Sequence, residues 1–330
     1  MSKAWKITIS IIASLLILIM GFLAVYYLWP WNKEFFDNAK KEWSIPGLDT
    51  SFTPPGLSKI QDQNKFLVSG YMSDGSASRF YVVDNESGEI IKYFTLSVDE
   101  REYTGHAGGI VSHGSSVWVV GDKCCYRFTL NDINNVDNGN KVYAKAWFKL
   151  EYNNADFVFA NDGVLYIGEF YKAGKHETSE KHHMRTRSGE MNTAIVYGFD
   201  IDEQEKIGLS DIYPDLAISI RGLCQGIDMT SDGKFVMSTS YSLPDSNIYY
   251  YKDVLSEESH GTYRYGYDTI PLWYLDNEAL ISSTNAPAMS EEVAVHNGNV
   301  YILFESASKK YRLINRKRLY NVYSLPISAL

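Results

Sequence analysis

The chain has 330 residues, of which 45% are hydrophobic and 22% charged, a composition that is typical of a folded protein and excludes wholesale disorder. Its net charge of -9 argues against a nucleic-acid partner, because no basic stripe with interleaved aromatic residues is present. The short groups Lys309-Lys310 and Arg316-Lys317-Arg318 are interpreted as a solvated edge.

Residues 7–29 carry no charge and consist mainly of Ile, Leu, Val, Ala and Phe. About 23 residues at 1.5 Å each give roughly 34 Å of helix, which is enough to span a bilayer. Basic Lys3 and Lys6 precede the run, and aromatic residues crowd its far end: Tyr26, Tyr27, Trp29 and Trp31. These flanks predict a single-pass anchor in the plasma membrane, with residues 1–6 as a cytoplasmic tip and the rest of the chain outside.

A cleaved signal peptide is the alternative to the anchor. The apolar run is longer than a usual signal-peptide core, and no Ala-x-Ala site follows it, so an uncleaved anchor is favoured. Three cysteines fit an exported domain of bacterial type without a disulfide framework. A bond between adjacent Cys124 and Cys125 would be strained, and a partner for Cys224 stays open.

Residues 30–55 mix charges with four prolines and are interpreted as a stalk, which leaves residues 56–330 as the folded domain. From residue 56 onward, apolar runs of four to eight residues alternate with Gly, Asn, Asp and Ser turns, which predicts an all-β fold. Five similar turns recur, each followed by an apolar strand; they lie at 61–65, 113–116, 161–163, 231–234 and 296–299.

Further strands are expected after each of these hairpins. Third strands are predicted at 79–84, 126–130, 193–200, 247–252 and 310–314, and fourth strands at 90–96, 142–150, 216–221, 272–275 and 321–326. Five four-stranded units at about 55 residues each predict a five-bladed β-propeller. A sixth blade would have to lie in the spacers 201–220 or 253–285.

The segment Phe80-Tyr81-Val82-Val83-Asp84, followed by Ser87-Gly88-Glu89-Ile90-Ile91, resembles the YVTN-type repeat of bacterial propellers. The turn Ser231-Asp232-Gly233-Lys234 is similar to turns of that group and of WD40-like and lactonase-like propellers. The resemblance implies propeller architecture over most of the chain and implies no particular activity. No Trp-Asp pair ends a third strand, which departs from WD40 repeats proper.

In a propeller, the starts of the innermost strands and the loops after the second strands share one face, where small residues are expected because the strands converge. The polar exceptions at the strand starts are His106, Asp156, Gln225, Glu291 and Glu292. His106, Asp156 and Glu291 form a hypothetical Ca²⁺ site, because hard cations prefer oxygen ligands. The simpler interpretation is a set of channel-lining residues that are hydrogen-bonded to water.

The insertion at residues 171–192 is long for a compact blade, and such loops are often functional. Its candidate side chains are His176, His182, His183 and Glu190. We expect a mobile lid with ligand-contacting groups; a zinc site is the alternative, although no His-Glu-x-x-His spacing is present.

Glu169 and Glu305 each follow a second strand at the same position of the repeat. Two carboxylates about 5–9 Å apart would suit acid and base catalysis, as in glycosidases. The simpler interpretation is that both bond to neighbouring loop N–H groups.

Two functions stay open from the sequence. The first is a membrane-anchored extracytoplasmic module that binds a protein, peptide or glycan at the channel face. The second is a Ca²⁺-assisted hydrolase or lyase that uses the same face. The absence of nucleophile-elbow, Walker and dinucleotide motifs leaves the question of catalysis open.

Overall fold

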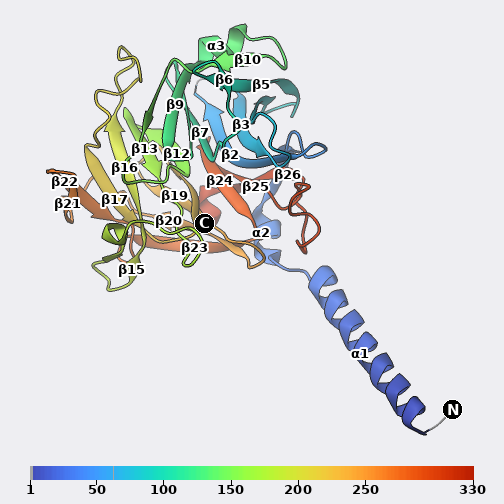
Figure 1. Ribbon diagram of the computed structural model, residues 1–330. Helices are drawn as coiled ribbons and strands as arrows, with labels where there is room; N and C mark the ends of the chain where they lie inside the picture. Colours follow the sequence, from blue (N-terminus) through green and yellow to red (C-terminus); the bar gives the residue numbers. More distant parts are fainter. Residues whose placement is uncertain (1–2, 62) are drawn as a thin grey trace.

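The innermost strands of five sheets form a closed ring in the computed structural model, which describes residues 3–61 and 63–330. Around this ring β2 neighbours β7, β7 neighbours β12, β12 neighbours β18, β18 neighbours β24, and β24 neighbours β2. Each inner strand begins a blade of antiparallel strands (Figure 1). The predicted five-bladed β-propeller is therefore confirmed.

The blades follow one another along the chain. Blade 1 contains β2 (Phe52–Ile60), β3 (Lys65–Met72), β4 (Arg79–Asp84) and β5 (Ile90–Val98). Blade 2 contains β7 (Gly109–His113), β8 (Ser116–Gly121), β9 (Cys124–Thr129) and β11 (Ala146–Lys149). Blade 3 contains β12 (Phe157–Asn161), β13 (Val164–Gly168), β16 (Ala194–Asp200) and β17 (Leu216–Ile220). Blade 4 contains β18 (Cys224–Met229), β19 (Phe235–Thr239), β20 (Ser246–Tyr251) and β23 (Leu280–Ala286). Blade 5 contains β24 (Ser290–His296), β25 (Asn299–Phe304), β26 (Asn321–Pro326) and β1 (Lys40–Ser44).

The structure also contains helices and additional strands outside these four-stranded blades. The helices are α1 (Lys3–Leu28), α2 (Lys33–Asn38), α3 (Leu130–Asn135), η1 (Glu180–His182) and η2 (Ile327–Ala329). The additional strands are β6 (Arg101–Glu102), β10 (Lys141–Tyr143), β14 (Met184–Arg185), β15 (Met191–Asn192), β21 (Gly261–Tyr265) and β22 (Asp268–Tyr274). Strand β10 extends blade 1 in parallel with β5, and β22 extends blade 3 in parallel with β17.

The predicted turns join the first two strands of every blade. Two of them contain consecutive residues of positive φ, at Asp162-Gly163 (47° and 78°) and at Asn297-Gly298 (48° and 74°). This is the backbone conformation that two-residue hairpins require and that Asx-Gly pairs adopt readily. In the first turn, Asp62 lies outside the described residues.

The segment predicted as a stalk, residues 30–55, instead contributes to the propeller. Strand β1 pairs antiparallel with β26 and becomes the outer strand of blade 5, and β2 already begins at Phe52. Phe35 of α2 is fully buried between blades 4 and 5, and Trp43 of β1 is also buried. Residues 30–55 are therefore part of the folded domain, because β1 supplies the outer strand of blade 5.

Two strand predictions near the C-terminus are wrong, because in both blades the outer strand comes from a segment that was not predicted as one. Residues 310–314 form turns within the loop 305–320, and the third strand of blade 5 is β26, which was predicted as its fourth. In blade 4 the outer strand is β23, whereas residues 272–274 belong to β22 and extend blade 3. The hairpin of β21 and β22 and strand β23 occupy the spacer 253–285. The described residues therefore hold five blades and leave no strands for a sixth.

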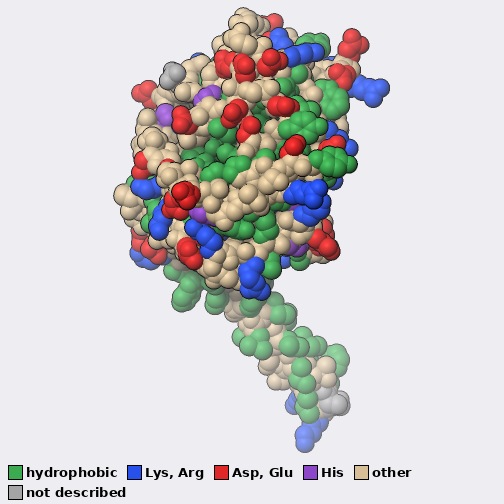
Figure 2. All heavy atoms as spheres, turned by 90° about the vertical axis from the view of Figure 1, so that its left-hand side faces the viewer, with side chains coloured by type: hydrophobic (Ala, Val, Ile, Leu, Met, Phe, Trp, Pro, Cys, Tyr) green, Lys and Arg blue, Asp and Glu red, His purple; other side chains and the backbone are tan. Residues whose placement is uncertain are grey.

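Helix α1 projects away from the propeller with its apolar side chains exposed (Figures 1 and 2). From Trp5 onward it forms most of the stretch Trp5–Asn38, the candidate membrane span in the described part of the chain. Of the predicted cytoplasmic tip, residues 1 and 2 lie outside the described residues. Cys124, Cys125 and Cys224 are free thiols.

Candidate functional site

One face of the propeller collects most of the predicted site residues. We call it the channel face; it consists of the starts of β2, β7, β12, β18 and β24 together with the loops that follow β3, β8, β13, β19 and β25. The hairpin turns lie on the opposite face, because the first strand of each blade runs from one face to the other.

Glu292 closes the channel at its centre. From β24 of blade 5, its carboxyl group accepts hydrogen bonds from the backbone N–H groups of Leu57 (2.7 Å), Ile110 (3.3 Å) and Val158 (3.3 Å), which belong to the inner strands of blades 1, 2 and 3. A Cβ atom at Gly226 of blade 4 would lie 2.6 Å from the Cα atom of Glu292. The side chain of Glu292 therefore binds the inner strands of blades 1, 2 and 3. Its backbone lies so close to the inner strand of blade 4 that only glycine fits at position 226.

The environment of Glu292 favours its neutral form. Burial raises the pKa of Glu292 well above its usual range, although the three backbone N–H groups act in the opposite direction. Nearer the hairpin-turn face, Asp228 accepts from the N–H of Val295 (2.6 Å), and Lys59 donates to the Val295 carbonyl (2.9 Å). Burial raises the pKa of Asp228 to about 6. The channel is thus filled by polar side chains that are bonded to the strands around it.

Glu291 and Glu305 form a carboxyl pair at the channel face. Their carboxyl groups interact with each other, and burial followed by the charge of Glu305 raises the pKa of Glu291 well above its usual range. Burial also raises the pKa of Glu305 to about 7. Two carboxyl groups this close cannot both ionise cheaply, so the pair holds a proton at neutral pH. The Oε1 atom of Glu291 is buried without a hydrogen-bond partner in the described residues.

An aromatic and cationic cluster lies beside this pair. The rings of Tyr71 and His106 stack with centroids 4.6 Å apart, and Lys310 Nζ donates to the Tyr71 hydroxyl (2.6 Å). Lys310 also lies 4.9 Å from the ring centroid of Tyr311. Burial and then the charge of Glu305 raise the pKa of Tyr71 to about 12, so the phenol stays neutral. The end of β3 in blade 1 and loops of blades 2 and 5 thus meet at the channel face.

Asp156 and Gln225 have structural partners within their own blades. Asp156 Oδ2 accepts from the N–H of Phe170 (2.7 Å), and Gln225 Nε2 donates to the carbonyl of Ser240 (3.3 Å). Burial raises the pKa of Asp156 to about 7. Each side chain links the start of a first strand to the end of the second strand in the same blade.

Glu169 and Glu305, predicted as a possible acid and base pair, have different partners. Glu169 is buried against His182 Nδ1 in blade 3, whose Nε2 lies 3.2 Å from the hydroxyl of Tyr197. Tyr197 in turn donates to Tyr263 (3.1 Å). Burial raises the pKa of Glu169, and His182 opposes that shift. The repeat places the two acids at equivalent positions, but their side chains enter different environments.

The segment 171–192 is an ordered cover over the edge of blade 3. His182 is fully buried, His183 Nε2 lies 3.0 Å from the Thr178 hydroxyl, and Glu190 accepts from the N–H of Asn277 (2.7 Å). Arg187 binds both carboxylate oxygens of buried Asp276, each at 3.0 Å. The predicted mobile lid is therefore tied down at several points, because its polar residues bond inward.

His176 is the predicted lid residue that lies toward the channel face. Its ring packs edge-on against Phe170, with centroids 5.4 Å apart. Burial lowers the pKa of His106, and the nearby His176 contributes to that shift. Nearby, Lys172 lies 5.2 Å and Lys175 5.7 Å from the ring centroid of Tyr241. These residues extend the aromatic and cationic surface toward blade 4.

The predicted Ca²⁺ ligands His106, Asp156 and Glu291 are not gathered into one coordination group. Among residues 3–61 and 63–330, no group of three or more His, Cys, Asp or Glu side chains has the arrangement of a metal site. The reason is visible in their partners: His106 stacks on Tyr71, Asp156 accepts a hydrogen bond from the N–H of Phe170, and Glu291 lies beside Glu305. The same finding removes the zinc alternative for the insertion.

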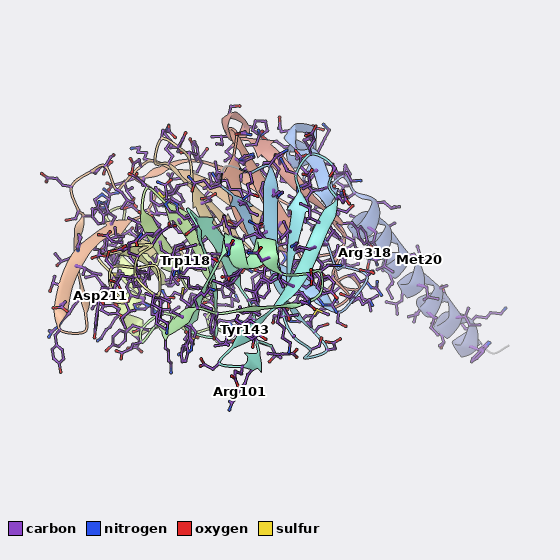
Figure 3. All side chains as sticks on the ribbon, turned by 90° about the horizontal axis from the view of Figure 1, so that it is seen from above. Met20, Arg101, Trp118, Tyr143, Asp211 and Arg318 are labelled. Carbon is purple, nitrogen blue, oxygen red and sulfur yellow. The ribbon has the colours of Figure 1, made fainter. Side chains whose placement is uncertain are left out.

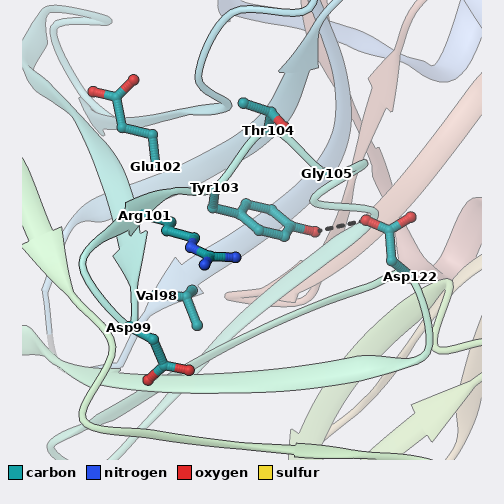
Figure 4. Close-up of a pocket in the computed structure, with 8 residues that line it drawn as sticks. All are labelled: Val98, Asp99, Arg101, Glu102, Tyr103, Thr104, Gly105 and Asp122. Carbon is teal, nitrogen blue, oxygen red and sulfur yellow. Dashed lines mark hydrogen bonds between the residues drawn. The ribbon is translucent and has the colours of Figure 1, made fainter.

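A cavity of about 610 Å³ adjoins His106 on the outer side of the channel face. Figure 4 shows its lining, in which the ring of Tyr103 points toward Asp122, with 3.5 Å between the hydroxyl and Oδ2. The same Oδ2 atom accepts from the backbone N–H of His106 (3.3 Å). A second cavity of about 880 Å³ lies on the hairpin-turn face, between the turns of blades 3 and 4.

Three features of the site could not be read from the sequence motifs. Glu292 was expected among the channel residues, but its role in joining three inner strands depends on the closed ring. Tyr71 and Lys310 were not among the predicted site residues, although Tyr71 lies near the end of the second strand β3 and Lys310 lies in the loop that follows the second strand of blade 5. Their position at the ends of second strands and in the loops after them is the signal that would have found them.

The sequence matches no protein-family model, and no curated protein matches it. Solved structures that resemble the fold include hydrazine synthase from Kuenenia stuttgartiensis (13% identity, TM-score 0.37, 79% of this chain and 66% of that chain covered). BamB from Moraxella catarrhalis is 8% identical (TM-score 0.36, 87% of this chain and 97% of that chain). The PQQ-bound aldose sugar dehydrogenase from Streptomyces coelicolor is 11% identical (TM-score 0.46, 87% of this chain and 96% of that chain).

These similarities concern the fold alone. They do not select a family, so the resemblance to the YVTN-type repeat stays a prediction. The function is argued below from the residues of the channel face.

Proposed function

We propose that the protein is a membrane-anchored binding module that holds a protein, peptide or glycan ligand outside the cytoplasm, at the channel face. The observation that carries this proposal is the cluster of half-buried Tyr71 with exposed His106 and Lys310, which lies beside the buried carboxyl groups of Glu291 and Glu305. The Oε1 atom of Glu291 is buried without a hydrogen-bond partner in the described residues, and a ligand group that entered the carboxyl pair and donated to this atom would remove the cost of an unpaired acceptor.

The chemistry of the cluster supports a ligand that is rich in hydroxyl or amide groups. The aromatic faces of Tyr71, His106 and Tyr241 suit stacking against sugar rings or peptide groups, and Lys172, Lys175 and Lys310 supply hydrogen-bond donors. Glu292 seals the channel below, so the ligand is expected to rest on the face without passing through the ring.

The proposed anchor is the apolar stretch at the N-terminus, with residues 1–6 in the cytoplasm. Its support is the exposure of α1 along its whole length together with the aromatic residues at its end toward the propeller. Since Phe35 of α2 is already buried between blades 4 and 5, only residues 30–34 separate the proposed span from the folded domain.

A binding screen of the full chain tests the proposal. Purified protein in detergent is applied to arrays of glycans and of peptides, and each ligand that binds is measured again with Tyr71→Ala and Glu291→Gln. We expect at least a tenfold loss of affinity with Tyr71→Ala, which corresponds to the loss of one aromatic contact. Tyr267→Ala is the control, because Tyr267 is 97% exposed at the distant β21–β22 turn.

Binding that is equally strong in wild type, Tyr71→Ala and Glu291→Gln would contradict the assignment of the site. The absence of binding to either array would contradict the proposed ligand classes. Thermal unfolding of each variant separates a loss of affinity from a loss of folding.

A further inference from the structure

The loop 305–320, between β25 and β26, is the most basic part of the chain. Six of the ten residues from 309 to 318 are Lys or Arg, and no Asp or Glu occurs after Glu305. The protein as a whole carries a net charge of -9. This loop therefore presents a local positive charge on an acidic molecule.

The same loop contacts the end of α1. The hydroxyl of Tyr26 donates to the carbonyl of Ile314 (3.3 Å), and Lys317 Nζ donates to the carbonyl of Trp31 (2.7 Å). The guanidinium of Arg316 lies 4.3 Å from the ring centroid of Trp31. Figure 3 shows Arg318 on the side of the propeller from which α1 departs. The loop and the proposed membrane anchor are thus adjacent in space.

The tip of the loop is apolar and exposed. Leu313 is 77% exposed and Ile314 49%, while Lys309, Arg312 and Arg318 around them are also exposed. Arg316 differs from these, since it forms an ion pair with Asp245. Large apolar side chains flanked by basic ones are typical of segments that lie at a membrane interface.

The position of Tyr26 sets the depth of this tip. It lies two residues before the end of α1 at Leu28, so at 1.5 Å per residue it is roughly 3 Å from the end of the helix. In a helix that spans a bilayer, aromatic residues at this position lie in the headgroup region. Ile314, whose carbonyl contacts the Tyr26 hydroxyl, is therefore placed at the same level.

We propose that the loop 305–320 rests on anionic phospholipid headgroups of the membrane that α1 spans. Leu313 and Ile314 enter the interface, and Lys309, Arg312 and Arg318 bind the lipid phosphates. This inference rests on the proposed anchoring of the protein by α1.

The contact would orient the candidate site. Glu305 begins the loop, and Lys310 within it binds Tyr71, so the channel face and the lipid-binding loop belong to one surface. In Figure 1, α1 and β15 of the cover segment both project from the lower side of the propeller. A ligand of the channel face would therefore be bound close to the membrane surface.

Spin-label accessibility in bilayers tests the depth of the loop. The full chain with Cys124→Ser, which removes the half-buried thiol, is labelled at Leu313→Cys and reconstituted in phosphatidylcholine with or without phosphatidylglycerol. With phosphatidylglycerol we expect collisions with oxygen to exceed those with a water-soluble nickel complex. A label at Tyr267→Cys should show the opposite ratio, because that position is 97% exposed at a turn of blade 3.

Charge reversal tests the role of the basic residues. The combined change Lys309→Glu, Arg312→Glu and Arg318→Glu should move the label at position 313 into water. The matched change Lys149→Glu, Lys206→Glu and Lys252→Glu removes three exposed lysines from blades 2, 3 and 4 and should leave it in place.

The outcomes separate this inference from the proposed anchor. A chain that resists carbonate extraction, but keeps the label at 313 in water in every bilayer, overturns the lipid contact and leaves the anchor standing; an acidic protein would then be the better partner for the loop. Equal insertion with and without phosphatidylglycerol overturns the preference for anionic lipid. A chain that carbonate removes overturns the anchor and the loop contact together.

Discussion

At the scale of single residues, Glu292 has the largest structural role in the channel. Its carboxyl group accepts from three backbone N–H groups that belong to three different blades. Those N–H groups lie at the centre of the ring, where inner strands do not pair with each other. One side chain therefore provides hydrogen bonds that the regular sheets cannot provide.

Replacement of Glu292 by Leu is expected to lower the free energy of unfolding by about 3 kcal/mol or more, because each buried N–H that loses its acceptor costs about 1–3 kcal/mol. Glu292→Gln keeps the volume and one acceptor oxygen, so we expect a loss of about 1–2 kcal/mol. Urea denaturation of the full chain, followed by tryptophan fluorescence, measures both. Equal stability of wild type and Glu292→Leu would show that the three bonds contribute nothing.

At the scale of elements, β1 completes blade 5 from the opposite end of the chain. It pairs with β26 through Lys40, Lys41 and Ser44, and it buries Trp43 against Phe66, with ring centroids 5.7 Å apart. Without this strand, β26 would be an exposed edge with unpaired backbone groups, which favours aggregation. The N-terminal segment thus joins α1 directly to the last blade.

A fragment that begins at residue 30 should therefore fold, whereas one that begins at residue 46 should aggregate or unfold at a lower temperature. In the longer fragment, Trp43→Ala is expected to lower the free energy of unfolding by about 3–5 kcal/mol, as for other buried aromatic residues. Size-exclusion chromatography and thermal unfolding compare the fragments. A monomeric 46–330 fragment with an unchanged melting temperature would contradict this role of β1.

At the scale of the whole molecule, buried acids make stability depend on pH. Burial raises the pKa of Asp228 from 3.8 to about 6, of Asp156 from 3.8 to about 7, and of Glu305 from 4.5 to about 7. Between pH 4 and 7 the folded chain therefore binds more protons than the unfolded chain. Under that condition the free energy of unfolding falls as the pH rises.

We expect the full chain to melt at a higher temperature at pH 5 than at pH 8. Asp228→Asn should reduce the difference, because this group no longer changes its charge. Asp74→Asn is a control of opposite sign. Hydrogen bonds from Ser76 lower the pKa of Asp74 to about 2, so the stability that its carboxylate contributes to the folded chain is lost only as the pH falls below about 4. Melting curves across this range measure the effect, and a melting temperature that rises from pH 5 to pH 8 would contradict it.

The sequence by itself determined the features that depend on neighbouring residues. Asp162-Gly163 and Asn297-Gly298 adopt positive φ because of local backbone chemistry, and their recurrence was enough to predict five blades. The uncharged run at residues 7–29 likewise identified the candidate span from composition alone. The acids at 291 and 292 stood out as polar residues at the start of an apolar strand.

Only the tertiary structure decided which distant residues meet. Lys40 pairs with Ser324, and Tyr26 meets Ile314, across nearly the whole length of the chain. Glu305 pairs with Glu291 while Glu169 pairs with His182, although the repeat makes Glu169 and Glu305 equivalent. The physical reason is that ring closure and side-chain direction depend on packing between blades, and a short sequence pattern carries no information about contacts between segments so far apart.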